Sequence, residues 1–139
     1  MKVKDVMHRG ATCVRPDTSL RAVAKCMRNG DVGAIAVQAD GKLLGIVTDR
    51  DVACRALANG KDVAKMTAAD VMSRRVVSCW AEDDIKSAVA KMEAKKIRRL
   101  PVLDSRKAMV GMLSLGDISH AASRQMSGEV LRAVSGHHR

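Results

Sequence analysis

The chain has 139 residues, 47% hydrophobic and 29% charged, a mixture that predicts a folded domain and excludes a disordered chain. No apolar run approaches the roughly 18 residues of a membrane-spanning helix, and no apolar stretch follows the first basic residues, so we expect no membrane span, no secretory signal and a cytoplasmic location. The net charge of +10 suggests anionic partners. The charge is divided evenly, since residues 1–66 hold 12 Lys and Arg and 7 Asp and Glu, and residues 67–139 hold 13 and 8. This even distribution differs from that of a protein with a basic tail or a single basic recognition helix.

The predicted elements, taken in chain order, occur twice. In the first half we predict an extended segment at Thr12–Val14 and a helix that begins near Thr18. Two strands follow, Ala34–Val37 and Leu43–Val47, joined by a turn at Asp40-Gly41, and then a second helix at Asp49–Ala58. After a connector at Asn59–Thr67, the second half repeats this order, with an extended segment at Val77–Cys79 and a helix that begins near Asp83. Its two strands are Leu100–Leu103 and Met109–Leu113, joined by a turn at Asp104–Lys107, and its second helix is Leu115–Ala133. Residues beyond Met126 have the composition of a polar tail.

The two halves also match residue by residue. Asp5-Val6-Met7 recurs 65 positions later as Asp70-Val71-Met72, and Gly45–Asp51 matches Gly111–Asp117 with one further inserted residue. Apolar residues with the i, i+3, i+4, i+7 spacing of a helix face recur as well: Leu20, Val23, Ala24 and Met27, then Ile85, Ala88, Val89 and Met92. The sequence therefore predicts an α/β (α+β) fold of two β-α-β-β-α repeats, 1–62 and 63–126, packed with pseudo-two-fold symmetry and followed by a tail at 127–139.

A hydroxyl residue followed three positions later by a carboxylate ends the second strand of each repeat. These pairs are Thr48 with Asp51 and Ser114 with Asp117. One interpretation is a capping box at a helix start. The other is a ligand site, because a carboxylate can accept both vicinal hydroxyls of a ribose and strand ends in α/β layers often hold ligands. Both interpretations stay open on the sequence alone.

These residues carry a resemblance to a known family. The duplicated unit, the endings Gly45–Asp51 and Gly111–Asp117, and the stretch Ile97–Asp104 together resemble a tandem CBS-domain pair, or Bateman module, of the stand-alone bacterial type, over roughly residues 1–122. The resemblance implies a regulatory sensor that binds adenosine-containing ligands such as AMP, ADP or ATP in two clefts between the repeats. It also implies a homodimer, no required cofactor, and a downstream protein that responds to the ligand; it leaves open whether Mg²⁺ accompanies the nucleotide.

The resemblance implies two sets of ligand-binding residues, each drawn from both repeats. The first cleft comprises Thr48, Asp51, Val76, Val77, Arg98 and Arg99. The second comprises Ala11, Thr12, Gly33, Ala34, Ser114 and Asp117. We expect Arg98 and Arg99 to bind phosphates, because guanidinium groups form strong paired hydrogen bonds to them, whereas Gly33 and Ala34 offer only backbone and space. Arg98 and Arg99 have an alternative interpretation as a solvated basic edge.

Two departures from the family pattern weaken the second cleft. Ala36 stands where the family usually has proline, and Gly116 replaces the possible phosphate contact that Arg50 offers in the first repeat. We therefore expect the Thr48/Asp51 cleft to bind the phosphorylated ligand and the other to bind weakly, differently or not at all.

No catalytic or metal-binding arrangement is predicted. The four cysteines form no Cys-x-x-Cys pair and are expected mainly in the core, and the four histidines lack metal-ligand spacing. Cys79 has no neighbouring histidine to act as a base, so a nucleophilic role is not expected. No pair of carboxylates is arranged for catalysis either, because Glu82, Asp83 and Asp84 lie where a helix start attracts acidic residues, and we predict that the protein is not an enzyme. Two alternatives remain: a nucleic-acid-binding module, which the near absence of aromatics disfavours, and an accessory subunit that holds an enzyme without binding a ligand.

Overall fold

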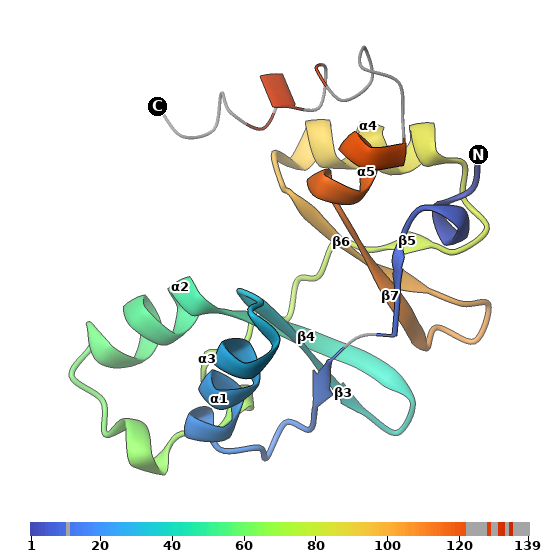
Figure 1. Cartoon of the computed structure of the whole chain (residues 1–139). Coiled ribbons are helices and arrows are strands. Elements are labelled where there is room, and N and C mark those ends of the chain that lie inside the picture. Colours follow the sequence, from blue (N-terminus) through green and yellow to red (C-terminus); the bar gives the residue numbers. More distant parts are fainter. Residues whose placement is uncertain (11, 122–127, 129–130, 133, 135–139) are drawn as a thin grey trace. The chain divides into compact units, whose positions relative to one another are not determined.

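The computed structural model describes residues 1–10, 12–121, 128, 131–132 and 134, and the chain forms two compact units (Figure 1). Unit 1 consists of Met1–Gly10 and Val77–Arg139, and unit 2 of Ala11–Val76. The chain therefore begins in unit 1, forms the whole of unit 2, and returns to unit 1. Both units contain a mixed sheet and helices, so the predicted α/β class with two β-α-β-β-α repeats is confirmed.

Unit 2 contains a three-stranded sheet in the order β2-β3-β4. Its elements are β2 (Cys13–Val14), α1 (Leu20–Gly30), β3 (Ala34–Ala39), β4 (Lys42–Thr48), α2 (Asp49–Asp51), the π-helix η2 (Val52–Leu57), the 3-10 helix η3 (Val63–Lys65) and α3 (Ala68–Val71). Strand β3 is parallel to β2 and antiparallel to β4. The β3–β4 hairpin turns at Asp40 and Gly41, which both have positive φ angles, as the Asp-Gly pair predicts.

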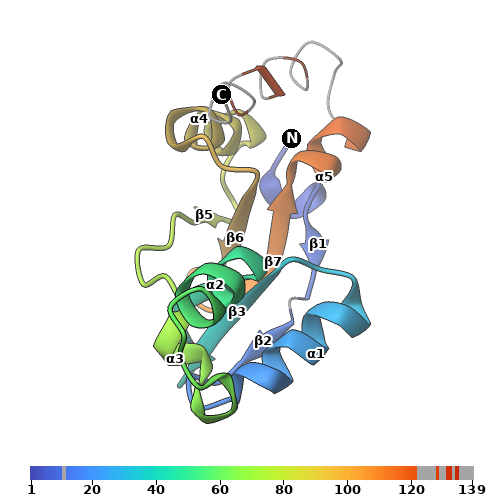
Figure 2. The same cartoon turned by 90° about the vertical axis from the view of Figure 1, so that its left-hand side faces the viewer.

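Unit 1 contains the corresponding sheet with one more strand, in the order β1-β7-β6-β5 (Figure 2). Its elements are the 3-10 helix η1 (Val3–Asp5), β1 (His8–Arg9), β5 (Cys79–Trp80), α4 (Ile85–Lys95), β6 (Arg99–Leu103), β7 (Met109–Ser114) and α5 (Leu115–Ala121). Strand β6 is parallel to β5 and antiparallel to β7, and β1 is antiparallel to β7 on its other side. The counterpart of β1 in unit 2 is a single bridge between Ile46 and Ser73.

Side-chain caps fix where the two long helices begin. The Ser19 hydroxyl accepts a hydrogen bond from the Ala22 N–H at 3.1 Å, and the Asp84 carboxylate accepts one from the Lys86 N–H at 2.9 Å. The helices thus start within two residues of the predicted positions. The predicted apolar face of α4 is buried, with Met92 fully buried. In α1, Leu20, Val23 and Met27 are buried, but Ala24 is exposed, so the prediction is wrong for that residue.

The two repeats exchange their leading segments. Val3, in the first repeat, is fully buried in the core of unit 1 with Met92, Leu100 and the rest of that cluster. At the start of the second repeat, the equivalent segment of α3 is buried in the core of unit 2, where its members are Ala68, Val71 and Met72. Each unit is therefore completed by a segment of the other repeat.

The second helix of each repeat differs from its prediction. In the first repeat the predicted helix Asp49–Ala58 is an α-helical turn followed by the π-helix η2, in which the Ala58 N–H donates to the Ala53 carbonyl at 2.9 Å. A hydrophobic pattern of only six residues cannot distinguish this wider turn from an α-helix. In the second repeat α5 is described to Ala121; most of the predicted helix to Ala133, and most of the polar tail, lie outside the described residues.

An ion-pair cluster holds the leading segment in unit 1, and it predicts a pH dependence of stability. Lys2 and Lys4 donate to the Glu82 carboxylate at 2.6 and 2.8 Å and lower its pKa from 4.5 to about 2. The contribution is present above pH 4.5 and disappears as the pH falls towards 2, because the folded state keeps this carboxylate ionised longer than the unfolded chain does. We expect Glu82→Gln to lower the melting temperature slightly at pH 7 and not at pH 2, measured by circular dichroism.

Glu93→Gln is the matched control, since Glu93 forms no ion pair within the described part of the chain. An equal loss of stability for Glu82→Gln at both pH values would contradict the assignment to this ion-pair cluster.

Candidate functional site

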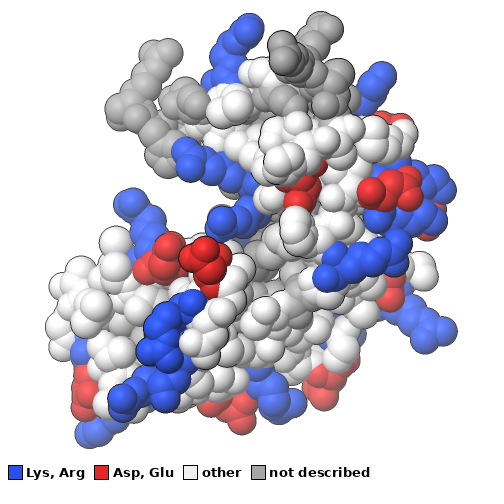
Figure 3. Space-filling view, in the orientation of Figure 1, with Lys and Arg blue, Asp and Glu red and all other residues white. Residues whose placement is uncertain are grey.

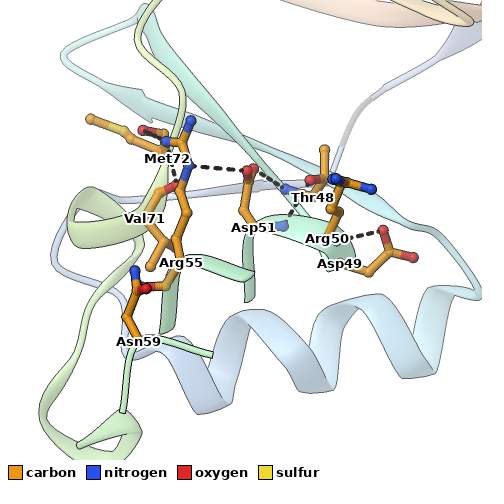
Figure 4. Close-up of polar contacts among 8 residues, drawn as sticks. All are labelled: Thr48, Asp49, Arg50, Asp51, Arg55, Asn59, Val71 and Met72. Atoms are coloured by element: carbon orange, nitrogen blue, oxygen red, sulfur yellow. Dashed lines mark hydrogen bonds and ion pairs between the residues drawn. The ribbon is translucent and has the colours of Figure 1, made fainter. Parts of the chain in front are cut away.

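The first hydroxyl–carboxylate pair lies where β4 runs directly into α2 (Figure 4). The Thr48 N–H donates to Asp51 Oδ2 at 2.8 Å, and the Asp51 N–H donates to Thr48 Oγ1 at 3.1 Å. Ala34 lies opposite Thr48 on the neighbouring strand, and the Gly33 carbonyl accepts a hydrogen bond from the Asp49 N–H at 3.0 Å. The predicted capping box is therefore present, and it uses one of the two carboxylate oxygens of Asp51.

The other oxygen of Asp51 faces a cation from the next turn of the same helix. Arg55 Nε is 3.6 Å from Asp51 Oδ1, and Arg55 Nη1 donates to the carbonyls of Val71 and Met72 at 3.2 and 3.3 Å (Figure 4). Arg55 thereby connects the end of α3 to the carboxylate. Arg55 was not among the predicted site residues, although its i, i+4 spacing from Asp51 is a usable signal.

The second pair has the same backbone geometry at the β7–α5 junction. The Ser114 N–H donates to Asp117 Oδ2 at 2.9 Å, and the Asp117 N–H donates to Ser114 Oγ at 3.2 Å. The remaining oxygen, Oδ1, lies 2.5 Å from Nδ1 of His8 in β1. The Asp117 side chain is only 6% exposed, compared with 16% for that of Asp51. His8 was not among the predicted site residues either.

A third capping box shows that the motif has a structural role of its own. The Thr67 N–H donates to Asp70 Oδ2 at 2.8 Å at the start of α3, and Asp70 is exposed. A hydroxyl–carboxylate pair therefore stabilises a helix start in this chain wherever it occurs. Any ligand-binding role of Asp51 and Asp117 has to use the carboxylate oxygens and lone pairs that remain.

The residues predicted for each cleft come from both units. For the first cleft, Thr48, Asp51 and Val76 lie in unit 2, whereas Val77, Arg98 and Arg99 lie in unit 1. For the second, Thr12, Gly33 and Ala34 lie in unit 2, and Ser114 and Asp117 in unit 1; Ala11 is outside the described residues. The grouping of these residues into two clefts stays a prediction.

Within unit 1, the two arginines lie beside the second hydroxyl–carboxylate pair. Arg99 is the partner of Ser114 in the β6–β7 ladder, and the Arg98 carbonyl accepts a hydrogen bond from the Leu115 N–H at 3.0 Å. Both arginines are exposed, and neither side chain forms a hydrogen bond or ion pair within the described residues. Their guanidinium groups are therefore available to an anion.

Other chemistry receives no support from the described residues. No three His, Cys, Asp or Glu side chains of this part of the chain lie close enough to share a metal ion. Burial raises the pKa of the Cys79 thiol to about 11, which makes it a poor nucleophile. Cys54, in contrast, is exposed, so the prediction that cysteines belong mainly to the core is wrong for it.

The distribution of basic residues can be seen on one face of the molecule (Figure 3). On the face shown in Figure 3, Lys and Arg side chains are interspersed with Asp and Glu and do not form one continuous basic surface. No helix among the described residues is both long enough and apolar enough to cross a membrane.

Comparison with known proteins gives a consistent result. The family described as "CBS domain" matches residues 3–56 and 68–124. The CBS domain-containing protein YhcV of Bacillus subtilis is 35% identical over 134 residues, which cover 96% of this chain and 94% of that protein. The structure of Hypoxic Response Protein I with two coordinated zinc ions has a TM-score of 0.80 and 31% identity, covering 88% of this chain and 100% of that chain.

A further solved structure contains bound ligands. It is the CBS domain pair of protein MJ0100 in complex with 5′-methylthioadenosine and S-adenosyl-L-methionine, with a TM-score of 0.76 and 27% identity. The similarity covers 86% of this chain and 95% of that one.

Proposed function

The chain belongs to the CBS domain family, and on that basis we propose that it is a non-catalytic regulatory module that binds adenosine-containing ligands, with AMP, ADP or ATP as the expected class. The observation that carries the proposal is the pair of hydroxyl–carboxylate junctions, Thr48/Asp51 and Ser114/Asp117, repeated at the same place in each unit. The adenosine compounds bound by the MJ0100 pair support the same ligand class.

The chemistry of the first junction suits a ribose. Asp51 uses one oxygen in the capping box, so its remaining lone pairs can accept the two vicinal hydroxyls of the sugar. The Thr48 hydroxyl accepts one backbone N–H and still has its own hydrogen to donate. These two side chains can therefore bind a diol without giving up the helix cap.

A phosphate requires cations, and the proposed cleft supplies them from the other unit. Arg98 and Arg99 are exposed, and their charged groups are not consumed by internal hydrogen bonds among the described residues. In our proposal they bind the phosphate of a ligand whose ribose is held by Thr48 and Asp51. A ligand that contacts both units would favour one arrangement of the two, and a homodimer partner or a downstream protein would respond to that arrangement.

The proposal is tested first by a thermal-shift screen of the full chain with AMP, ADP, ATP, NAD, S-adenosylmethionine and 5′-methylthioadenosine. A specific ligand at one hundred times its Kd stabilises the folded state by about 2.7 kcal/mol, which gives a clear rise in melting temperature. Titration calorimetry then measures the affinity for the best ligand in the wild type and in Asp51→Ala. We expect a loss of about tenfold or more, the factor for removing a hydrogen bond to a charged group.

Asp70→Ala is the matched control, because it removes the carboxylate of the third capping box without touching the proposed site. Both variants should lose the stability of one helix cap, but only Asp51→Ala should lose ligand affinity. Equal affinities in the wild type and Asp51→Ala would contradict the proposed site. Binding of oligonucleotides with a steep salt dependence, and of none of the six small molecules, would favour the nucleic-acid alternative.

A further inference from the structure

The carboxylates of the two proposed sites, Asp51 and Asp117, differ in the side chain that contacts them. Asp117 Oδ2 accepts the Ser114 N–H at 2.9 Å, and Oδ1 lies 2.5 Å from His8 Nδ1. Both oxygens therefore have a partner, and the side chain is only 6% exposed. His8 itself is 82% exposed and projects from a strand of two residues at the edge of the sheet.

The corresponding place in unit 2 has no such occupant. Ser73 stands 65 residues after His8 and pairs with Ile46, just as His8 pairs with Met112. The Ser73 side chain forms no hydrogen bond within the described part of the chain. The two repeats thus place different side chains at one structurally equivalent position.

The counterions of the two carboxylates also come from different places. Asp51 is paired at 3.6 Å with Arg55, which is also bound to two backbone carbonyls and so has a structural task of its own. The residue equivalent to Arg55 in the second repeat is Ala121, which has no charge. Asp117 therefore depends on His8, and the His8 ring has no other hydrogen-bond partner among the described residues.

From these contacts we infer that His8 is a resident occupant of the Ser114/Asp117 site and excludes a sugar from it until the imidazole is displaced. The inference rests on the proposed function, in which the carboxylate binds the ribose diol. A diol that binds across both oxygens of Asp117 would have to share Oδ1 with the His8 imidazole, so ligand and imidazole compete for the same carboxylate oxygen. At the Thr48/Asp51 site the counterion Arg55 stays 3.6 Å from the carboxylate, beyond hydrogen-bond distance, so we expect that site to fill first.

The contact itself is tested without a ligand. In the full chain labelled with 15N-histidine, the ring spectrum of His8 should show a hydrogen on Nδ1, because only a protonated nitrogen can donate to the carboxylate. Asp117→Asn keeps an oxygen for the Ser114 N–H but removes the charge that faces His8, and it should shift the His8 ring signals. Unchanged His8 signals in Asp117→Asn would overturn the inference.

Competition is tested by titration calorimetry with AMP and with 5′-methylthioadenosine. The background is Asp51→Ala, which leaves the Asp117 site as the one under study. Adding His8→Ser copies the residue of the other repeat and should raise the affinity by about tenfold or more, the factor for one hydrogen bond to a charged group. Adding Asp117→Asn to that double variant should abolish the gain.

The outcomes separate the inference from the proposed function. If the wild type binds either probe but His8→Ser changes nothing in the Asp51→Ala background, the inference is wrong and the proposed function stands. If neither the wild type nor any His8→Ser variant binds any of the six small molecules of the thermal-shift screen, the proposed function is wrong and the inference falls with it.

Discussion

Gly111→Ala is expected to destabilise unit 1 by about 1–3 kcal/mol, the usual effect of adding a methyl group where no space exists. A Cβ at this position of β7 would collide with the His8 carbonyl oxygen and lie 2.8 Å from the Met7 sulfur. Gly111 does not have a positive φ angle, so the effect is steric. Strand β1 would have to move away from β7, and urea unfolding followed by circular dichroism would report the loss.

Gly116→Ala is the control within the same unit, since its Cβ would meet only Ser114 Oγ at an ordinary 3.6 Å. Gly45→Ala should reproduce the loss in unit 2, where the Cβ would lie 2.7 Å from the Ser73 carbonyl oxygen. A Gly111→Ala chain as stable as the wild type would show that β1 does not approach β7 this closely.

Leu100→Ala is expected to cost about 2–5 kcal/mol, the largest stability effect we predict for a single substitution. Leu100 is fully buried in β6 and belongs to a core cluster that also includes Met92, Leu113 and Ile118. Removing its side chain eliminates apolar contacts and leaves a cavity that rigid neighbours cannot fill. The measurement is the free energy of unfolding in urea.

Leu57→Ala serves as the control because Leu57 is 63% exposed, and its loss should change the free energy of unfolding by no more than about 0.5 kcal/mol. Equal effects of the two substitutions would mean that Leu100 does not contribute to a core.

Much of the fold could be predicted because its signals are local. The duplicated i, i+3, i+4, i+7 stripes predict α1 and α4, and the Asp40-Gly41 pair predicts its hairpin. The strands end as predicted at the hydroxyl residues Thr48 and Ser114 to within one residue. In each case neighbouring residues along the chain determine the structure, and a single sequence displays them.

The remainder depends on contacts between distant residues. Strand β1 consists of only His8 and Arg9, both exposed, so it has no alternation of polar and apolar residues from which a strand could be predicted. Its pairing with Met112 and Gly111 joins residues about a hundred positions apart. The ion partner of Asp117 follows from that pairing, which is why the sequence predicted the carboxylate but not His8. Whether the predicted site residues form two clefts stays a prediction.

The exchange of leading segments between the repeats has a consequence for dissecting the protein. A fragment of residues 1–66 would lack the three residues of the α3 segment that complete the core of unit 2, and a fragment of residues 67–139 would lack Val3. Neither half is therefore a self-sufficient folding piece, but co-expressed halves could complement each other. A single repeat on its own would need the leading segment of a second molecule to complete its core, as in a domain-swapped dimer. In the tandem chain the other repeat supplies that segment.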